Sequence, residues 1–498
     1  VAIGYTAMNA NATAAADGAV AIGYQALNAL TSGEGNVAIG YQALDAENDG
    51  DYSTAVGYQA LSGQEGVTGE VGNTAIGYKA GVGIGSSTQC TVIGNKALYT
   101  DDDSDGSTVV GAYAMYYQNG GTGNSGNTGV GKNAGHNNVT GTNNTYLGYD
   151  AGLGNTGDSN SQNTGVGKDA LKSIQTGTYN VAVGREAAPN VTTGSYNTAV
   201  GINSLYLETI GSLATAFGES ALGSQTMDSV ENSFNTGIGS ACGYHNDTGT
   251  KNTSVGHHAM FGSDGDSNSN NTAVGYNALA LIETGGGNVA LGAGAGETLT
   301  TGANNVLLGY FAGSYDGTDI LSGGGNVLVG NYNKVPAADT DYASVIGYYV
   351  TGIASAFTWG NHTTDSSVAY GATSISAPSD GRMKEDVQDC TAGLDFINDL
   401  RPVTYKWKKK KDIPEELKSH EAESEERFKN DKINHGFIAQ EVKEVIDSHS
   451  EIKDGFDMWS EDETDGRQRI GEGSLVPMLV TAVQELSTEL EDLKKKVG

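Results

Sequence analysis

Cysteine, proline, aromatic residues and long hydrophobic runs are scarce in this sequence, and each scarcity excludes a class of protein. Three cysteines in 498 residues (Cys90, Cys242 and Cys390) make no disulfide framework. Six prolines exclude collagen and a proline-rich linker. No run of about 20 apolar residues is present, so the sequence predicts no membrane insertion. Aromatic residues at 7% are few for compact globular cores.

Positive charge is also scarce, and it divides the chain in two. Residues 1–378 hold 8 Lys and Arg against 30 Asp and Glu, a net charge of 8 − 30 = −22. Residues 379–498 hold 19 against 29, a net charge of −10, and the two parts sum to the formal −32 of the chain. Because phosphates repel a long anionic surface, we expect no nucleic-acid binding by the first part.

Glycine is abundant, with 74 residues, and much of it belongs to a repeat. A five-residue pattern, Asn-Thr/Val-Ala/Gly-Ile/Val-Gly, recurs through the first part, as NVAIG at 36–40 and NTAVG at 271–275. Its closing glycine falls at positions from 4 to 371, mostly 17 residues apart. Seventeen residues are too few for a crossover with a helix, so the repeat predicts a long parallel β-roll or β-helix of about 21 coils. The chain opens inside a repeat, so we expect a segment to precede it.

Each position of the repeat has a predicted role. The apolar residue before the glycine is expected to enter the interior of a short strand. Three residues after the glycine, alanine recurs, as at Ala26 and Ala278, and this slot must be small because identical slots stack. Asparagine four residues before the glycine suits a turn and would stack into an amide ladder. Cys242 occupies the small slot, so we expect a buried, inert thiol, and Cys90 replaces the asparagine.

The NxAIGxxA pattern resembles the head repeats of trimeric autotransporter adhesins, which form a left-handed parallel β-roll in a three-chain bundle. The resemblance covers about residues 1–350, the predicted shaft, and implies a homotrimer. The small slot is lost towards the end, at Asn333, Val350 and Ser374. We therefore assign residues 351–378 to a transition that follows the regular roll.

Acidic segments and paired histidines are the candidate metal sites of the shaft. Asp101, Asp103 and Asp105 precede a glycine, as at the start of a calcium-binding loop. The twelfth position would be Ala112, which excludes an EF-hand, so a solvated acidic loop is the alternative. The same interpretation applies to residues 45–51 and 262–268, and a metal at His257 and His258 has no further apparent ligand. No cofactor is expected.

The last 120 residues differ from the first part in composition and pattern, with little glycine and clear helical periodicity. Apolar residues at the end are spaced by three and four, which is typical of the a and d positions of a coiled coil over 475–498. They are Val476, Leu479, Val483, Leu486, Leu490, Leu493 and Val497. The alternative is a single amphipathic helix packed on its own domain.

Four ordered blocks identify this region. They are SDGRMKEDV from Ser379, RPVTYKW at 401–407, HGFIAQEV at 435–442 and the closing LVTAVQELSTELEDLKKKV. Together they resemble the C-terminal intramolecular chaperone domain of endosialidase-type phage tailspikes and tail fibres, over residues 379–498. The resemblance implies a small α+β domain that trimerises, guides folding of the preceding β-rich stem, and then cuts itself off before Ser379.

The resemblance also assigns the chemistry of the cut at the Pro378–Ser379 bond. Ser379 would be the nucleophile and Lys384, five residues later, the base. A lysine serves as a base only where burial or nearby cations lower its pKa, and an assembled trimer could supply that burial. Asp380 and Arg382 would orient the site or stabilise an oxyanion. The alternative is a polar turn in which Ser379 caps a helix.

These features together favour a viral tail fibre or fibre-like appendage, a homotrimer that is made in the host cytoplasm and acts extracellularly as part of the virion. It would attach to a host-surface glycan or envelope component, and its only inferred catalysis is a single-turnover serine–lysine autoproteolysis. The alternatives are a bacterial trimeric surface adhesin and a polysaccharide-depolymerising tailspike. The basic run at 406–411 is followed by the acidic segment 415–426, so we interpret it as a neutralised, solvated insertion.

Overall fold

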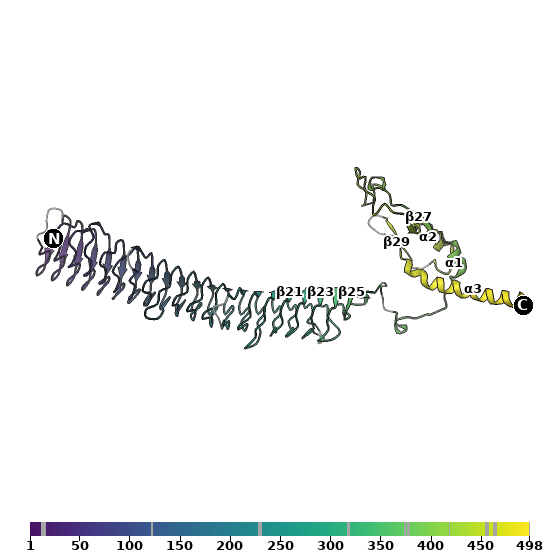
Figure 1. Cartoon of the computed structure of the whole chain (residues 1–498), viewed down its shortest axis with the longest axis horizontal. Helices are drawn as coiled ribbons and strands as arrows, with labels where there is room; N and C mark the ends of the chain where they lie inside the picture. The colour runs from purple at the N-terminus through teal and green to yellow at the C-terminus, as the bar shows by residue number, and fades with distance from the viewer. Residues whose placement is uncertain are drawn as a thin grey trace. The chain divides into compact units, whose positions relative to one another are not determined.

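The computed structural model of the chain describes residues 1–10, 16–120, 123–227, 232–315, 319–372, 375, 379–417, 419–453, 458–461 and 466–497. It divides into two compact units, Val1–Pro378 and Ser379–Gly498 (Figure 1). The first is mainly β, and the second is a small α+β unit that ends in a long helix. The predicted fold class, a parallel β-solenoid followed by a small α+β domain, is confirmed.

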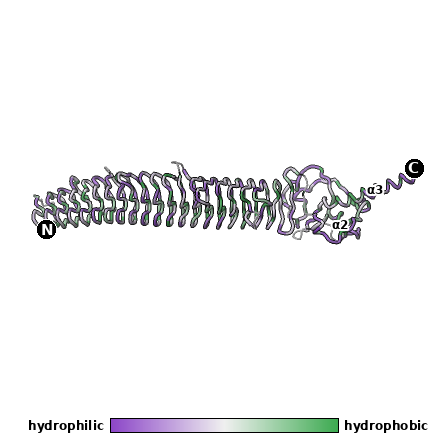
Figure 2. The backbone as a smooth tube through the Cα atoms, turned by 90° about the horizontal axis from the view of Figure 1, so that it is seen from below, coloured by the Kyte–Doolittle hydropathy of each residue, from purple (hydrophilic) through white to green (hydrophobic). Residues whose placement is uncertain are grey.

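The first unit is a stack of coils, and each coil contributes one short strand to a continuous parallel sheet (Figures 1 and 2). Neighbouring strands pair in register, so that Val20, Ala21 and Ile22 lie opposite Val37, Ala38 and Ile39, seventeen residues later. The strands are β1 (Ala2–Ile3), β2 (Val20–Ile22), β3 (Val37–Ile39), β5 (Thr54–Val56), β7 (Thr74–Ile76), β8 (Thr91–Ile93), β10 (Thr108–Val110), β12 (Thr128–Val130), β13 (Thr145–Leu147), β14 (Thr164–Val166), β15 (Val181–Val183), β16 (Thr198–Val200), β17 (Thr215–Phe217), β18 (Thr236–Ile238), β19 (Thr253–Val255), β20 (Thr272–Val274), β21 (Val289–Leu291), β22 (Val306–Leu308), β23 (Val327–Val329), β24 (Ser344–Tyr348), β25 (Ala356–Asn361) and β26 (Thr364–Ala369). Two side ladders, β4 (Gly50–Asp51) with β6 (Gly69–Glu70) and β9 (Ser104–Asp105) with β11 (Gly123–Asn124), are also parallel.

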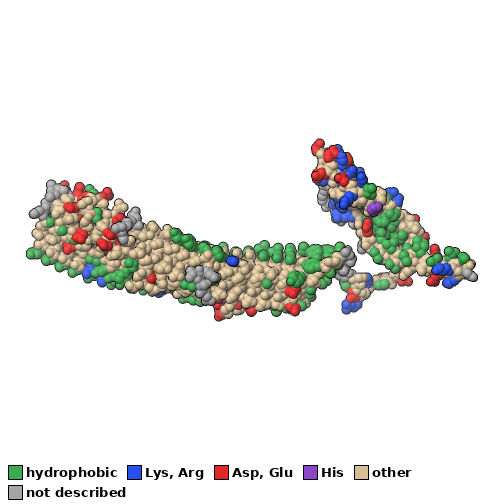
Figure 3. All heavy atoms as spheres, viewed as in Figure 1, with side chains coloured by type: hydrophobic (Ala, Val, Ile, Leu, Met, Phe, Trp, Pro, Cys, Tyr) green, Lys and Arg blue, Asp and Glu red, His purple; other side chains and the backbone are tan. Residues whose placement is uncertain are grey.

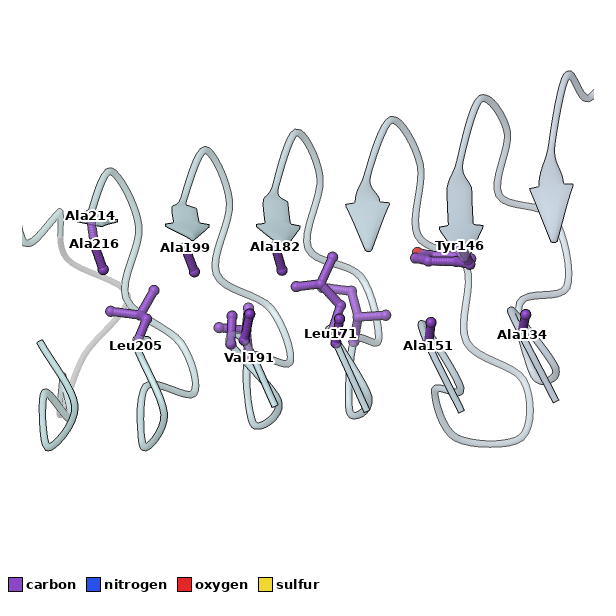
Figure 4. Packing of buried hydrophobic residues seen from close by; sticks show 14 of the residues in the cluster. Ala134, Tyr146, Ala151, Leu171, Ala182, Val191, Ala199, Leu205, Ala214 and Ala216 are labelled. Atoms are coloured by element: carbon purple, nitrogen blue, oxygen red, sulfur yellow. The ribbon is translucent and has the colours of Figure 1, made fainter. Parts of the chain in front are cut away.

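The interior is filled by small side chains, and one sequence prediction about it is wrong. The middle residue of each strand points inward, as Ala182, Ala199 and Ala216 do towards Leu171 and Leu205 (Figure 4). The residue before the closing glycine points outward instead. Successive side chains of a strand face opposite sides, and only the small middle residue fits the narrow interior. The small slot after the glycine is confirmed, because Ala26, Ala43, Ala60 and Ala278 are fully buried.

Buried asparagines form the predicted ladder, and they bond to the backbone as well as to each other. Asn180 Oδ1 accepts the backbone N–H of Asn197 at 2.9 Å, and Asn180 Nδ2 donates to the carbonyl oxygen of Gly194 at 2.8 Å. The same arrangement recurs at Asn36, Asn73, Asn127, Asn144, Asn163, Asn197, Asn235, Asn252, Asn271, Asn288, Asn305 and Asn326. Each coil that carries the asparagine therefore fixes the register of the next.

The closing glycine allows the coils to approach closely. Gly40 has φ +140°, and a Cβ built on it would lie 2.3 Å from the carbonyl oxygen of Gly57 in the next coil. No side chain fits at that distance, so the repeat requires glycine there in both conformation and space.

The solenoid does not end where the spacing of the closing glycines predicts. Gly347 pairs with Gly360, thirteen residues later, and not with Gly371, which the spacing had suggested as the last closing glycine. The strand β25 carries Thr358 in the inner position and Trp359 before the glycine, so it does not match the sequence pattern. β25 then turns back and pairs with β26 in antiparallel fashion. This hairpin ends the parallel stacking.

The second unit is built around one small core. It contains η1 (Gly381–Met383), α1 (Leu394–Asp399), β27 (Val403–Tyr405), η2 (Lys410–Asp412), β28 (Asn434–Gly436), α2 (Ala439–Ser448), β29 (Trp459–Glu461), β30 (Gln468–Ile470), η3 (Glu472–Leu475) and α3 (Val476–Val497). Two antiparallel pairs, β27 with β28 and β29 with β30, complete it. The buried core residues are Ala392, Phe396, Leu400, Val442, Ile446, Met458, Leu475 and Met478.

Candidate functional site

The two residues predicted to carry the cut lie in contact at the start of the second unit. Lys384 Nζ donates a hydrogen bond to Ser379 Oγ at 2.7 Å. The short helix η1 makes this contact possible, because it turns the chain back between them, with the N–H of Lys384 bonded to the carbonyl oxygen of Gly381 at 3.3 Å. Pro378, on the other side of the bond predicted to be cut, lies outside the described residues. The pair has the contact distance that a nucleophile and its base require.

Asp380 and Arg382 lie beside this pair and bond to each other. Asp380 Oδ1 accepts the backbone N–H of Arg382 at 2.9 Å, which makes Asp380 the N-cap of η1. The Arg382 guanidinium also donates to both oxygens of the Asp380 carboxylate, from Nε at 3.1 Å to each. These hydrogen bonds hold the pKa of Asp380 below its usual value. The two residues therefore stabilise the turn that brings Lys384 to Ser379.

The alternative in which Ser379 caps a helix is wrong, because Asp380 is the cap. Ser379 and Lys384 are both exposed in the single chain. In this contact Lys384 Nζ is the donor and Ser379 Oγ the acceptor, so the lysine must lose a proton before it can take that of the serine.

The sequence blocks that resemble the chaperone domain are joined in space. β27 of the RPVTYKW block pairs with β28 of the HGFIAQEV block, with Val403 opposite Gly436. Arg401 Nε donates to Glu441 Oε2 at 2.9 Å across the same two blocks. Our sequence reasoning missed this ion pair, since forty residues separate its members and no spacing rule connects them. It also missed Glu485, whose Oε2 accepts the N–H of Leu394 at 2.6 Å at the start of α1.

The long helix α3 has two different faces. Met478 and Ala482 are buried, and Met478 belongs to the core that also holds Phe396 of α1. The seven residues at the predicted a and d positions, which we call the a/d seam, lie outside this packed face of the helix. All seven are exposed, Leu486 by 49% and Leu490 by 52%. The helix therefore packs on its own unit through Met478 and Ala482, and the a/d seam is exposed to solvent in the single chain.

Three lysines of the basic run at 406–411 are neutralised by the acidic segment, as predicted. Lys410 forms ion pairs with Glu421 at 2.9 Å and with Glu426 at 3.4 Å, and Lys409 and Lys411 both contact Glu425. Two lysines around one carboxylate lower the pKa of Glu425 to about 2.

The candidate metal ligands of the shaft do not converge on one point. Asp105 accepts the N–H of Thr88 at 2.6 Å, Asp101 accepts from Ser87, and Asp103 accepts from Ser86. His257 stacks on Tyr276, with ring centroids 5.6 Å apart. Over the part of the chain that the structure describes, no group of three or more His, Cys, Asp and Glu side chains is placed to hold a metal ion.

The two shaft cysteines are buried, as predicted for Cys242. Burial raises the pKa of the Cys90 thiol to about 12 and that of Cys242 to about 11. Thiols with such values carry little thiolate near neutral pH, so both are unreactive.

Comparison with known proteins identifies the second unit. Residues 379–450 match the family described as chaperone of endosialidase, whose model is named as a peptidase. The match begins at Ser379 and reaches past the end of α2. No curated protein and no solved structure matches the chain significantly. The chain thus carries an endosialidase-type chaperone domain after a long β-solenoid.

Among the helices in the described residues, none is both long and apolar enough to cross a membrane.

Proposed function

We propose that the chain is a phage fibre or tailspike subunit that assembles as a homotrimer and removes its own chaperone domain by cutting before Ser379. The observation that carries this proposal is the Ser379–Lys384 contact at the first residue of the family match, which is also the first residue of the second unit. The shaft would be the mature product, and its function would be attachment to a host surface.

The proposed cut follows from the two side chains. Lys384, once deprotonated, takes the proton of Ser379 Oγ, and Oγ attacks the carbonyl carbon of residue 378. The bond from that carbon to the nitrogen of Ser379 breaks as the lysine returns the proton to this nitrogen, which leaves an ester on Oγ. Water then hydrolyses the ester, giving a carboxylate at residue 378 and a free amino group on Ser379. Burial in a correctly assembled trimer would lower the pKa of Lys384 and so delay the reaction until assembly.

Two uncovered apolar faces support the trimer. One is the a/d seam of α3, all seven residues of which are exposed. The other is the outer face of the shaft sheet, where residues before the closing glycine recur, such as Phe217 at 54% exposure and Leu291 at 52%. Figure 3 shows hydrophobic side chains along the edge where Figure 1 places β21, β23 and β25. Apolar rows of this length occur at interfaces between chains, because exposing them to water is unfavourable.

The chaperone role is tested by separating the units. Residues 1–378 produced alone should misassemble or aggregate, because parallel coils with long-range pairing need registration across three chains. The full chain should give native trimers in sedimentation. Recovery of native trimers from residues 1–378 alone, at the yield of the full chain, would remove the chaperone assignment.

A further inference from the structure

Two of the few cations of the shaft lie side by side in successive coils. Eight Lys and Arg lie in residues 1–378, and the first two, Lys79 and Lys96, occupy the same position of two successive coils, two residues after the closing glycine. Around them lie Tyr99, Tyr113 and Tyr116. We call these five residues the lysine–tyrosine ridge.

The ridge is held by close ring and ammonium contacts. Tyr99 and Tyr116 stack with centroids 4.8 Å apart and planes within 3°, and His136 of the following coil continues the stack at 5.4 Å. Lys96 Nζ lies 5.4 Å from the ring centroid of Tyr99 and 6.0 Å from those of Tyr113 and Tyr116. Lys79 Nζ lies 6.0 Å from the ring centroid of Tyr99. One ammonium group therefore has three rings around it.

The two lysines of the ridge differ from Lys168, Lys172 and Arg185 farther along the shaft, whereas the intervening Lys132 lies over a single ring, with Nζ 5.6 Å from the centroid of Tyr149. Lys168 and Lys172 both pair with Asp169, at 2.8 and 3.0 Å, and Arg185 pairs with Glu186 at 3.4 Å. Among the described residues, neither Lys79 nor Lys96 has an ion pair with a carboxylate. Aromatic rings attract a cation without neutralising it, so both ammonium groups keep their charge for a further partner.

The backbone under the ridge is fixed before any ligand arrives. The N–H of Lys96 bonds to the carbonyl oxygen of Tyr78 at 2.9 Å, and that of Tyr113 bonds to Asn95 at 2.9 Å. These bonds join each turn to the turn of the preceding coil. A site on such stacked turns loses little conformational freedom on binding.

The side chains of the ridge favour a polymeric ligand whose negative charges are carboxylates that lie far apart. Stacked rings present their edges outward, and an aromatic edge carries partial positive charge, as do the phenol O–H donors and the ammonium groups. All three favour a carboxylate. Salt screens charges that lie more than about 10 Å apart, so the acidic shaft repels a polymer according to the number of negative charges that fall within this distance. Nucleic acid brings several phosphates within it, whereas a polymer with well-separated charges brings few and is repelled less.

We propose that the lysine–tyrosine ridge binds an acidic polysaccharide, whose carboxylates contact Lys79 and Lys96 while its sugar rings lie against Tyr99, Tyr113 and Tyr116. This inference rests on the proposed attachment function and names the class of its ligand. The ridge follows the turns after the closing glycines, beside the strand face that we assign to the trimer.

The test compares charge-matched variants of the full chain. Lys79→Gln with Lys96→Gln removes the ridge cations, and the fold accepts glutamine there, because Gln25, Gln42 and Gln59 occupy the same position in other coils with the same left-handed φ of 49–54°. Lys172→Gln with Lys251→Gln is the control, with the same change of net charge. Tyr99→Ser with Tyr116→Ser tests the rings, and Ser62 occupies their position in an earlier coil.

Binding of hyaluronan, which carries one carboxylate in every two sugars, is measured, with dextran as the neutral polymer and single-stranded DNA as the phosphate polymer. The variants of the ridge lysine pair and of the ridge tyrosine pair should each weaken hyaluronan binding about tenfold, and the control pair less than about twofold. Equal loss in the control, or equal binding of DNA, would overturn the inference. If hyaluronan binds through the ridge but the wild-type chain adheres to no cell surface, the attachment function fails and the ridge assignment stands. If adhesion survives both ridge variants, the ridge is not the attachment site and the attachment function stands.

Discussion

Lys384 Nζ and Ser379 Oγ are 2.7 Å apart, and the three-residue helix η1 between them is capped by Asp380. A pair this close needs only the loss of a proton from the lysine to become a nucleophile and its base. Four predictions follow from this contact and from others in the two units, beginning with the cut itself.

Replacing either member of the pair should stop the cut. Wild-type trimers should yield pieces of 378 and 120 residues, whereas Ser379→Ala and Lys384→Ala should stay intact at 498 residues and still trimerise. Loss of a general base lowers rates by about 10²–10⁴-fold. Mass measurement under denaturing conditions separates the products, and Lys432→Ala, at an exposed lysine of the same unit, is the control. Cleavage that persists in Ser379→Ala would indicate an outside protease, and an intact wild-type trimer would show that the pair is inactive.

The exposed seam of α3 should hold the trimer together. Leu486→Glu with Leu490→Glu places two carboxylates where apolar side chains would be buried, each leucine being worth about 1.5–3 kcal/mol on burial. Sedimentation should show loss of the trimer for this variant. Thr488→Glu, on the same helix but off the seam, should leave the trimer unchanged. A seam variant that stays trimeric, or a folded wild-type monomer, would refute the assignment.

The asparagine ladder should contribute strongly to shaft stability. Asn180→Ala removes the acceptor for the N–H of Asn197 and the donor to Gly194, and each buried group left without a partner costs about 1–3 kcal/mol. The thermal unfolding midpoint of the shaft should fall for this variant. Asn95→Ala, at an exposed asparagine, should change it little. Equal midpoints for the two variants would show that the ladder is not a stabilising feature.

The second unit should lose stability as pH rises, through His449. Its ring nitrogens lie 3.0 Å from Asp399 Oδ2 and 2.9 Å from Glu451 Oε1, and these hydrogen bonds raise the pKa of His449 above its usual 6.5. A raised pKa means that the folded state binds the proton more tightly than the unfolded state. The contribution is complete below about pH 6.5 and disappears as pH passes through the folded-state value.

His449→Gln should remove this pH dependence. Urea unfolding of the full chain between pH 5 and 8, followed by a signal from the second unit, measures it. His435→Gln, at an exposed histidine, should keep the wild-type profile. Parallel profiles for wild type and His449→Gln would contradict the prediction.

The repeat made most of the shaft predictable, but not which side chains of each strand face the interior. Spacing alone defines the coil, the buried Ala26 slot and the Asn180 ladder, because each must recur identically to stack. It does not define which of two adjacent apolar residues faces inward. Ala38 and Ile39 both fit a strand, and the choice between them depends on the width of the interior, which no single coil reveals. The last coil was missed because Trp359 stands directly before its closing glycine, so the sequence of β25 does not match the repeat pattern.

The candidate cut site was predictable only in part. A recognisable block predicted Ser379 and Lys384, and the structure places them in contact. The cap at Asp380 was missed, because Ser and Asp are both good caps and only the backbone conformation distinguishes them. Ion pairs such as Arg401 with Glu441 depend on the fold of the whole unit, and no local pattern contains them.

The register of the coils also makes the length of the solenoid adjustable. Val181 and Thr198 hold equivalent places in neighbouring coils, so deletion of residues 181–197 would join Asn180 to Thr198 and restore the repeat as Asn-Thr-Ala-Val-Gly across the junction. Such a deletion would shorten the solenoid by about 4.8 Å, the spacing of adjacent strands. Recombination between repeats could therefore lengthen or shorten the solenoid in whole coils, while both ends keep their own sequences.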